Sequence, residues 1–199
     1  LGYSPSFSFR SLIENPTIFG EDPGLRSDEK GAWVHAGNLG VRANLHKYIM
    51  LDASFGYLED GESYSYKAPN TDSTYSYKNS YRNFSVSLKL YAKYDLEKVS
   101  FYLGGGIAPS LFINQGQRIN YSDANGNPRE QKNTFREGYS AFNLNLVASV
   151  GISYHFHRYA SFFFMPEYRH GLFNTYQKQS AFIRKPYSLG LHFGFSLDF

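Results

Sequence analysis

Two pairs of side chains in this sequence combine a carboxylate with a basic group in stretches with a strand-like pattern. Glu167 is matched with His192, and Asp52 is matched with Lys89. A buried carboxylate beside a base has a shifted pKa, so either pair is a candidate for proton transfer in catalysis. The same groups also neutralise each other as simple ion pairs where little water enters. We favour the ion-pair role and expect no catalytic residues.

The histidines are candidate metal ligands. Of the six histidines, only His155 and His157 are separated by two positions, the spacing that puts both on one face of a strand. A convincing metal site needs three or four ligands, and the chain has no cysteine to complete this one. We therefore expect no metal and no cofactor.

The positions of the charged residues within the predicted strands indicate which way their side chains point. In these strands the charges alternate with large apolar residues, which predicts that they face an interior. The residues expected to form this interior charge cluster are Arg10, Arg42, Asp52, Lys89, Lys93, Glu167 and Arg169. Positive and negative charges occur toward both ends of the strands, so we expect them to form salt bridges that plug the interior. A plugged interior argues against an open channel.

One alternating pattern recurs along the whole chain. Residues 187–199 place seven apolar side chains on one face and small or polar residues on the other, which requires an apolar medium on one side only. The segments with this pattern are 1–10, 33–45, 49–57, 84–94, 99–113, 142–156, 160–168 and 187–199. They predict one domain over residues 1–199, an all-β, eight-stranded antiparallel up-and-down transmembrane β-barrel.

Composition decides which face points inward. The chain holds 18 Tyr and 18 Phe, and these aromatic side chains would overfill an eight-stranded interior, whereas the glycines and serines of the other face suit it. A soluble β-sandwich also buries one face and is the alternative. No apolar run reaches the roughly 18 residues of a membrane helix. The net charge of +3 is too small to indicate nucleic-acid binding.

The connections alternate between short and long. Residues 46–47, 95–98 and 157–158 are short, whereas 11–31, 58–82, 114–140 and 170–185 are long, and long loops face outward in such barrels. Residues 63–67 and 74–78 are near copies around a turn signal, which predicts a hairpin above the membrane. Residues 123–128, Asp-Ala-Asn-Gly-Asn-Pro, are a second turn signal and predict another such hairpin in the third long connection. The tyrosines of the first hairpin fit either a plain hairpin or a sugar-stacking surface. The residues expected to contact a partner are Tyr75, Tyr77, Phe135 and Tyr139.

The first and last long connections differ in charge. The first is acidic, with Glu14, Glu21, Asp22, Asp28 and Glu29, and the last is basic, with Lys178, Arg184 and Lys185. Closure of the barrel brings them together, so we expect a polarised rim that orients a partner.

The final hairpin carries a family resemblance. Residues 166–170, Pro-Glu-Tyr-Arg-His, and residues 184–199 resemble the last hairpin of small outer-membrane β-barrel proteins with OmpA-, OmpX- and PorT-like members. This resemblance implies the bacterial outer membrane, export with a cleaved signal peptide that is not present in this sequence, and contact with lipid and lipopolysaccharide. It also implies recognition by the barrel-assembly machinery through Gly190, Phe195 and Phe199.

Lipid A deacylases are similar small barrels with a serine, a histidine and an acid near the outer leaflet. Here Leu172 stands where a serine would follow His170, and Ser180 is the loop candidate. Strand parity also directs Glu167 inward and His170 outward, which separates the pair. We therefore expect a non-catalytic structural or accessory subunit of a larger outer-membrane assembly. The alternatives are a lipid A-modifying enzyme and a surface adhesin or ligand receptor.

Overall fold

The computed structural model describes residues 1–15, 24–68, 74–122 and 126–197. Its elements are β1 (Gly2–Glu14), the 3-10 turn η1 (Gly24–Asp28), β2 (Lys30–His46), β3 (Ile49–Lys67), β4 (Thr74–Asp95), β5 (Val99–Ser122), β6 (Pro128–Phe135), β7 (Phe142–His157), β8 (Ala160–Gly171) and β9 (Phe182–Leu197). Within these residues no helix has the length and apolar character needed to cross a membrane.

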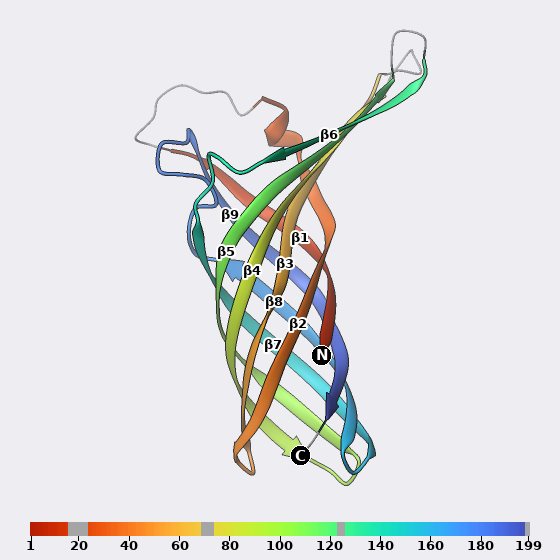
Figure 1. The fold of residues 1–199 in the computed structure, drawn as a ribbon, viewed down its shortest axis with the longest axis vertical. Helices are drawn as coiled ribbons and strands as arrows, with labels where there is room; N and C mark the ends of the chain where they lie inside the picture. Colours follow the sequence, from red (N-terminus) through yellow and green to blue (C-terminus); the bar gives the residue numbers. More distant parts are fainter. Residues whose placement is uncertain (16–23, 69–73, 123–125, 198–199) are drawn as a thin grey trace.

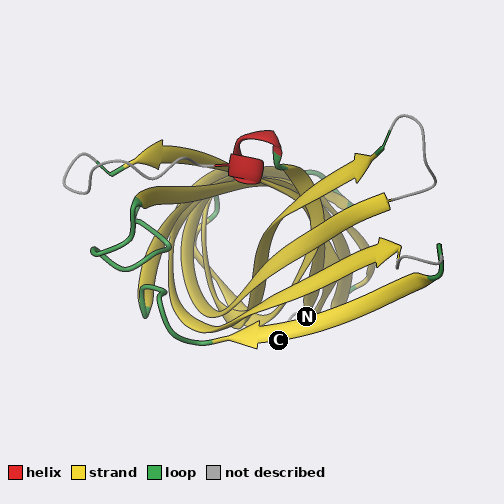
Figure 2. Ribbon diagram, turned by 90° about the horizontal axis from the view of Figure 1, so that it is seen from above, coloured by secondary structure: helices red, strands yellow, loops and turns green. Residues whose placement is uncertain are grey.

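Eight of the strands close into a barrel (Figures 1 and 2). Antiparallel pairing runs through β1, β2, β3, β4, β5, β7, β8 and β9, and β9 returns to β1. At this seam the amino group of Leu1 donates a hydrogen bond to the carbonyl of Phe195 at 3.0 Å. The predicted eight-stranded up-and-down barrel is confirmed, and closure removes the sandwich alternative.

Three strands continue well beyond the membrane-spanning segments predicted for them. β3 runs on to Lys67, β4 begins at Thr74 and β5 runs on to Ser122. The predicted hairpin arms pair from Ser63 opposite Lys78 to Lys67 opposite Thr74, while the turn signal between them lies outside the described residues. β6 is the second arm of the hairpin predicted in the third long connection: Arg118 lies opposite Lys132 and Ser122 opposite Pro128, while residues 123–125 of the turn signal lie outside the described residues. β6 pairs with β5 and forms the projecting ribbon of Figure 1.

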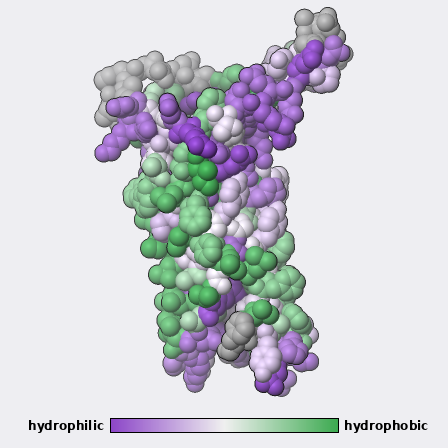
Figure 3. Space-filling view, viewed as in Figure 1, coloured by the Kyte–Doolittle hydropathy of each residue, from purple (hydrophilic) through white to green (hydrophobic). Residues whose placement is uncertain are grey.

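Large apolar side chains cover the outside of the barrel. Trp33, Leu88 and Phe195 are 61%, 49% and 60% exposed. A green band lies between purple ends in Figure 3, as expected for a wall that faces lipid. From Phe84 to Tyr94, β4 has about the 9 to 11 residues that a tilted strand needs to cross a bilayer.

The interior is narrow, and glycines make room in it. A Cβ at Gly151 would lie 2.3 Å from Cγ of Met165, and one at Gly190 would lie 2.2 Å from Oγ of Ser6. The predicted short connections join β2 to β3, β4 to β5 and β7 to β8 at one end of the barrel, so this end is assigned to the periplasm.

Candidate functional site

The periplasmic half of the interior is filled by apolar and aromatic side chains. Met50, Tyr91, Tyr102, Phe163 and Met165 form one buried cluster. The guanidinium of Arg42 lies 4.1 Å from the centroid of the Phe163 ring, and the hydroxyls of Tyr91 and Ser149 are 2.9 Å apart. This apolar layer closes the lower part of the lumen.

Above it lies a layer of ion pairs. Nζ of Lys89 and Nε of Arg169 are 3.1 and 2.5 Å from the two carboxylate oxygens of Glu167, and Nε of Arg42 is 2.8 Å from Oδ2 of Asp52. Lys89 and Glu167 are nearly fully buried. Their charges are therefore compensated where solvation by water is poor.

The other two residues of the predicted charge cluster lie at its ends. Lys93 is near the periplasmic end, where Nζ is 3.0 Å from Oδ2 of Asp95. Arg10 is at the opposite end, where it is paired with Glu29. The predicted cluster is therefore divided among three depths of the barrel.

The candidate catalytic pairs have other partners. Glu167 is held by Lys89 and Arg169, whereas Nε2 of His192 lies 3.0 Å from Oδ1 of Asn38. The cavity beside them has a volume of about 30 Å³. Such a space has room for one or two water molecules, which is too little for a lipid or sugar substrate.

The outward histidine also stands apart from its suggested partners. The ring of His170 stacks on Tyr168, with centroids 6.5 Å apart, on the lipid-facing side. The hydroxyl of Ser180 instead accepts a hydrogen bond from the backbone N–H of Phe182 at 3.3 Å. A serine, histidine and acid are therefore not assembled at this rim in the described part of the chain.

At the periplasmic mouth, sequence reasoning missed a contact between a serine and a histidine. Oγ of Ser100 is 2.9 Å from Nε2 of His155 and donates to Oδ1 of Asp95 at 2.6 Å. Ser100 is 1% exposed and its proton is directed at the carboxylate, so this arrangement does not present a nucleophile. No group of three metal-ligating side chains occurs among the described residues.

The extracellular half of the interior contains a second ion-pair layer that the sequence analysis did not identify. Nε and Nη2 of Arg184 lie 3.1 and 2.6 Å from Oε2 of Glu62. The hydroxyl of Tyr81 donates to Oε1 of Glu62 at 2.6 Å, and the Arg184 guanidinium is 3.8 Å from the Tyr81 ring centroid. Alternation, if extended beyond the membrane, would have found both residues. Glu62 shares its parity with Asp52, and Arg184 shares its parity with His192.

The 3-10 turn η1 is fastened to this layer. Glu29 accepts hydrogen bonds from Arg10 and from the hydroxyl of Tyr77, the latter at 2.7 Å. Burial, together with the nearby carboxylate of Glu62, raises the pKa of Glu29 above its usual value. The guanidinium of Arg26 is 5.7 Å from the Tyr176 and Phe182 ring centroids. These contacts close the outer mouth.

The inward turn of Glu29 and Arg184 removes these two residues from the expected polarised rim, whereas Glu14, Asp28 and Lys178 are exposed. Leu12 pairs with Arg184, so the first and last connections do lie together. However, Arg184 is 0% exposed and its guanidinium forms a buried ion pair with Glu62. Glu21 and Asp22 lie outside the described residues.

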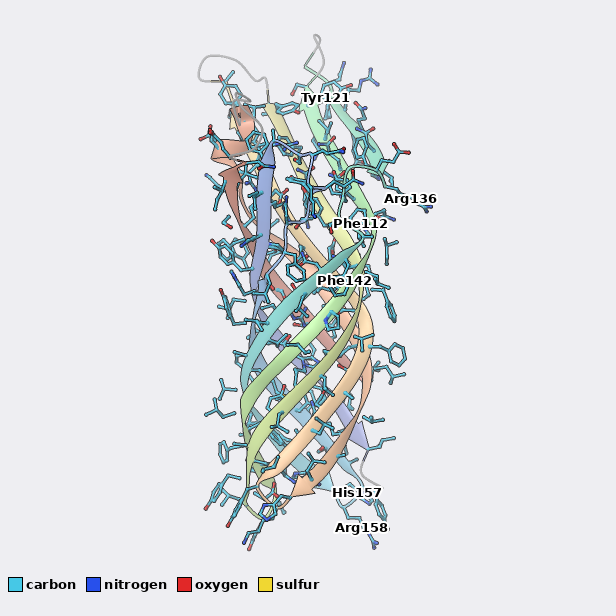
Figure 4. The ribbon with its side chains drawn as sticks, turned by 90° about the vertical axis from the view of Figure 1, so that its left-hand side faces the viewer. Phe112, Tyr121, Arg136, Phe142, His157 and Arg158 are labelled. Carbon is cyan, nitrogen blue, oxygen red and sulfur yellow. The ribbon has the colours of Figure 1, made fainter. Side chains whose placement is uncertain are left out.

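A sheet of four strands stands above the barrel wall. We call residues 58–67 of β3, 74–83 of β4, 114–122 of β5 and the whole of β6 the extracellular sheet. Figure 4 shows Tyr121 near its top, at the opposite end of the molecule from His157 and Arg158. Sheets that extend so far from the membrane offer backbone and side chains to molecules outside the cell.

The structure changes the set of expected partner contacts. Tyr77 is 8% exposed and bonded to Glu29, so it is removed from that set. Tyr139 is half-buried, its ring centroid 4.8 Å from that of Phe112, and burial raises the pKa of its hydroxyl to about 12. Tyr75 is half-buried beside Tyr77, whereas Phe135 is 45% exposed.

The three residues of the expected assembly signal lie in or after β9. Gly190 faces Ser6 inside the barrel, and Phe195 faces lipid with its ring centroid 5.5 Å from that of Phe162. Phe199 lies outside the described residues.

A match to a protein-family model agrees with this architecture. Residues 7–197 match the family model described as outer membrane protein beta-barrel domain. The Ail attachment invasion locus protein of Yersinia pestis, solved in complex with the heparin analogue sucrose octasulfate, is 13% identical. The match covers 96% of this chain and 95% of that one, with a TM-score of 0.32. Neisserial surface protein A is 10% identical, with coverage of 100% and 96% and a TM-score of 0.35. No curated protein matches the sequence.

Proposed function

Because the chain belongs to the outer-membrane β-barrel domain family, we propose that it is a non-catalytic surface protein whose barrel anchors a binding sheet outside the membrane. The observation that carries this proposal is the extracellular sheet itself. Its strands continue from the barrel wall, so the anchor and the sheet form one hydrogen-bonded structure. A binding surface built on such a continuous sheet is held in place before any partner arrives.

The closed lumen supports a binding role over transport or catalysis. An apolar layer and two ion-pair layers fill the interior. A transported solute would have to displace compensated buried charges, which costs several kcal/mol per ion. The lipid-facing wall contacts outer-membrane lipid and lipopolysaccharide, and the barrel-assembly machinery is the expected partner during biogenesis through Gly190, Phe195 and Phe199.

A second form of the proposal is the accessory subunit of a larger outer-membrane assembly. The observation that favours it is the edge of β6, which pairs with β5 on one side and has no other strand partner among the described residues. A free edge presents unpaired backbone groups and receives an added strand from another protein.

The test is photocrosslinking in living cells. Photoreactive residues replace Phe135 and Lys132 at the extracellular sheet, with lipid-facing controls at Leu88 and Phe164. We expect the first two sites to capture a defined extracellular or outer-membrane partner and the controls to capture lipid alone. An empty result at both sheet sites, combined with an altered lipid A mass spectrum when the gene is deleted, would replace this proposal with the lipid A-modifying enzyme.

A further inference from the structure

The inner face of the extracellular sheet carries an ordered array of aromatic and amide side chains. The strand registers place these residues in rows across β3, β4, β5 and β6. The rows are Tyr66, Tyr75, Tyr121 and Arg129; Tyr64, Tyr77, Ile119 and Gln131; Glu62, Asn79, Gln117 and Asn133; and Asp60, Tyr81, Gln115 and Phe135. The outermost row is therefore mainly tyrosine, and the row two steps below it is mainly amide.

The amides are connected to one another by hydrogen bonds. Oδ1 of Asn79 accepts from Nε2 of Gln115 at 3.0 Å and from Nε2 of Gln117 at 3.2 Å. Oε1 of Gln117 accepts from Nδ2 of Asn133 at 3.4 Å, and Oδ1 of Asn133 accepts from Nε2 of Gln131 at 3.2 Å. This ladder crosses from β4 to β6 and fixes the direction of each amide, so its remaining donors and acceptors are preorganised.

One buried acceptor in this array has no partner. Gln115 is 3% exposed, and its Oε1 has no hydrogen bond among the described residues. A buried acceptor without a partner carries a free-energy cost, because it has lost its hydrogen bond to water and gained none in the protein. A donor supplied from outside, such as a hydroxyl group, would remove this cost.

The tyrosines provide flat apolar surfaces beside the ladder. Tyr77 is buried and supports this surface from below: the ring of Tyr64 stacks on it with centroids 5.4 Å apart, and Tyr75 lies edge-on to it. In the outermost row, Tyr66 is 50% exposed and Tyr121 is 38% exposed. An exposed ring offers an apolar face, and its hydroxyl offers a polar edge.

From this pattern we infer that the inner face of the extracellular sheet binds an uncharged glycan. Sugar rings have apolar C–H faces that stack on aromatic rings and hydroxyls that both donate to and accept from amides. Neighbouring strands are about 4.8 Å apart, which is roughly the length of one hexose unit, so a chain lying along a row meets one strand per sugar.

The charges on this face favour a neutral glycan over a sulfated or otherwise anionic one. Glu62 is neutralised by Arg184, and Asp60 is buried. Arg129 is the single basic residue among the rows, and it lies at the β6 edge. A polyanionic chain is instead recognised by clusters of Lys and Arg.

This inference rests on the proposed function, because it names the ligand of the same sheet. The experiment uses the full chain refolded in detergent and measures binding to the uncharged polysaccharides dextran, mannan and laminarin, with heparin as the anionic counterpart. Purified lipopolysaccharide bearing an uncharged O-polysaccharide distinguishes a ligand in the protein's own membrane from one supplied by the surroundings. We expect at least one uncharged polymer to bind and heparin to bind at least tenfold more weakly.

Variants connect the binding to the rows. Replacing Tyr66→Ala and Tyr121→Ala together should weaken binding at least tenfold, and Gln117→Leu should weaken it by a similar factor by breaking the ladder. The matched control is Tyr159→Ala, since Tyr159 is also 50% exposed but lies at the periplasmic turn. Retention of the folded gel mobility shows that each variant keeps its barrel.

Three results would overturn the inference: no binding to any uncharged polymer, preferential binding to heparin, or equal loss in the Tyr159→Ala control. If crosslinking at β6 captures a protein while no glycan binds, the proposed function stands and the glycan inference fails. If neither a protein nor a glycan binds, both fail.

Discussion

Replacement of Arg184 by alanine is the sharpest test of how the outer half of the barrel is held. Arg184 is 0% exposed and donates twice to Glu62 and once, at 3.1 Å, to Oγ1 of Thr175. Its guanidinium also covers the ring of Tyr81. The alanine variant removes all of these contacts and leaves the Glu62 carboxylate buried beside a cavity.

The expected loss follows from what remains around Glu62. Removal of one partner from a buried ion pair costs about 3–5 kcal/mol. The hydroxyl of Tyr81 still donates at 2.6 Å, and Nε of Arg10 is 3.9 Å away, so part of the charge stays compensated. We therefore expect the lower end, about 3 kcal/mol, which is roughly a 150-fold change in the unfolding equilibrium.

The assay is urea unfolding in lipid vesicles, followed by the different gel mobilities of the folded and unfolded chain. The surface control is Arg118→Ala, because the Arg118–Glu130 pair is 61% and 42% exposed and should contribute only about 0.2–1 kcal/mol. Combining Glu62→Gln with Arg184→Met should be less damaging than Arg184→Met alone, since no unpaired charge remains. A loss for Arg184→Ala no larger than that of Arg118→Ala would refute the buried-pair reasoning.

Three further predictions concern the lumen, the seam and the outer mouth. Planar bilayers containing the pure protein should show no large steady conductance, because the apolar layer around Tyr91 and Met165 blocks the lumen; reproducible large openings would contradict this. Gly190→Ala should destabilise refolded barrels by about 1–3 kcal/mol in urea titrations through overpacking, mainly against Ser6 and less against Ser4, and Ser6→Gly should recover most of this loss. If Gly190 also serves assembly, the double variant should still accumulate poorly in cells, and a normal cellular level would exclude that role. Glu29 has a folded-state pKa above the ordinary value of 4.5, so the folded chain binds this proton more tightly. Its contribution to the unfolding free energy should rise as pH falls from neutral through the folded-state pKa and level off below about 4.5, and Glu29→Gln should abolish this increment in pH-dependent urea titrations.

The sequence was most informative where lipid imposes a rule on every second residue. Phe84 and Leu88 alternate with small or charged residues because one side of β4 meets lipid and the other a narrow lumen. The same rule placed Lys89 and Glu167 inside, although it could not assign their partners. Partner choice depends on strand registers, and periodicity within a single strand does not contain them.

Above the membrane the alternation of apolar and polar residues is weaker, and the sequence predicted side-chain positions there less well. Both faces of β6 are largely exposed, so its sequence, PREQKNTF, shows no apolar alternation. Tyr77 was expected at the surface, but Glu29 accepts a hydrogen bond from its hydroxyl and Tyr77 is buried. The sequence could not predict this contact, because the position of Glu29 depends on the path of η1. Arg184 was assigned to a loop because the membrane pattern begins only at Tyr187, although its parity already pointed inward.

The position of Trp33 makes the chain its own optical reporter. It is the single tryptophan of the sequence, it is 61% exposed on the lipid-facing side of β2, and its ring centroid lies 5.5 Å from that of Phe7 across the β1–β2 pair. Its emission therefore arises from one depth, near the outer end of the lipid-facing wall. Lipids brominated at successive acyl carbons would quench it in proportion to their proximity. Insertion, orientation and closure of the first two strands can thus be followed in real time without attaching a dye.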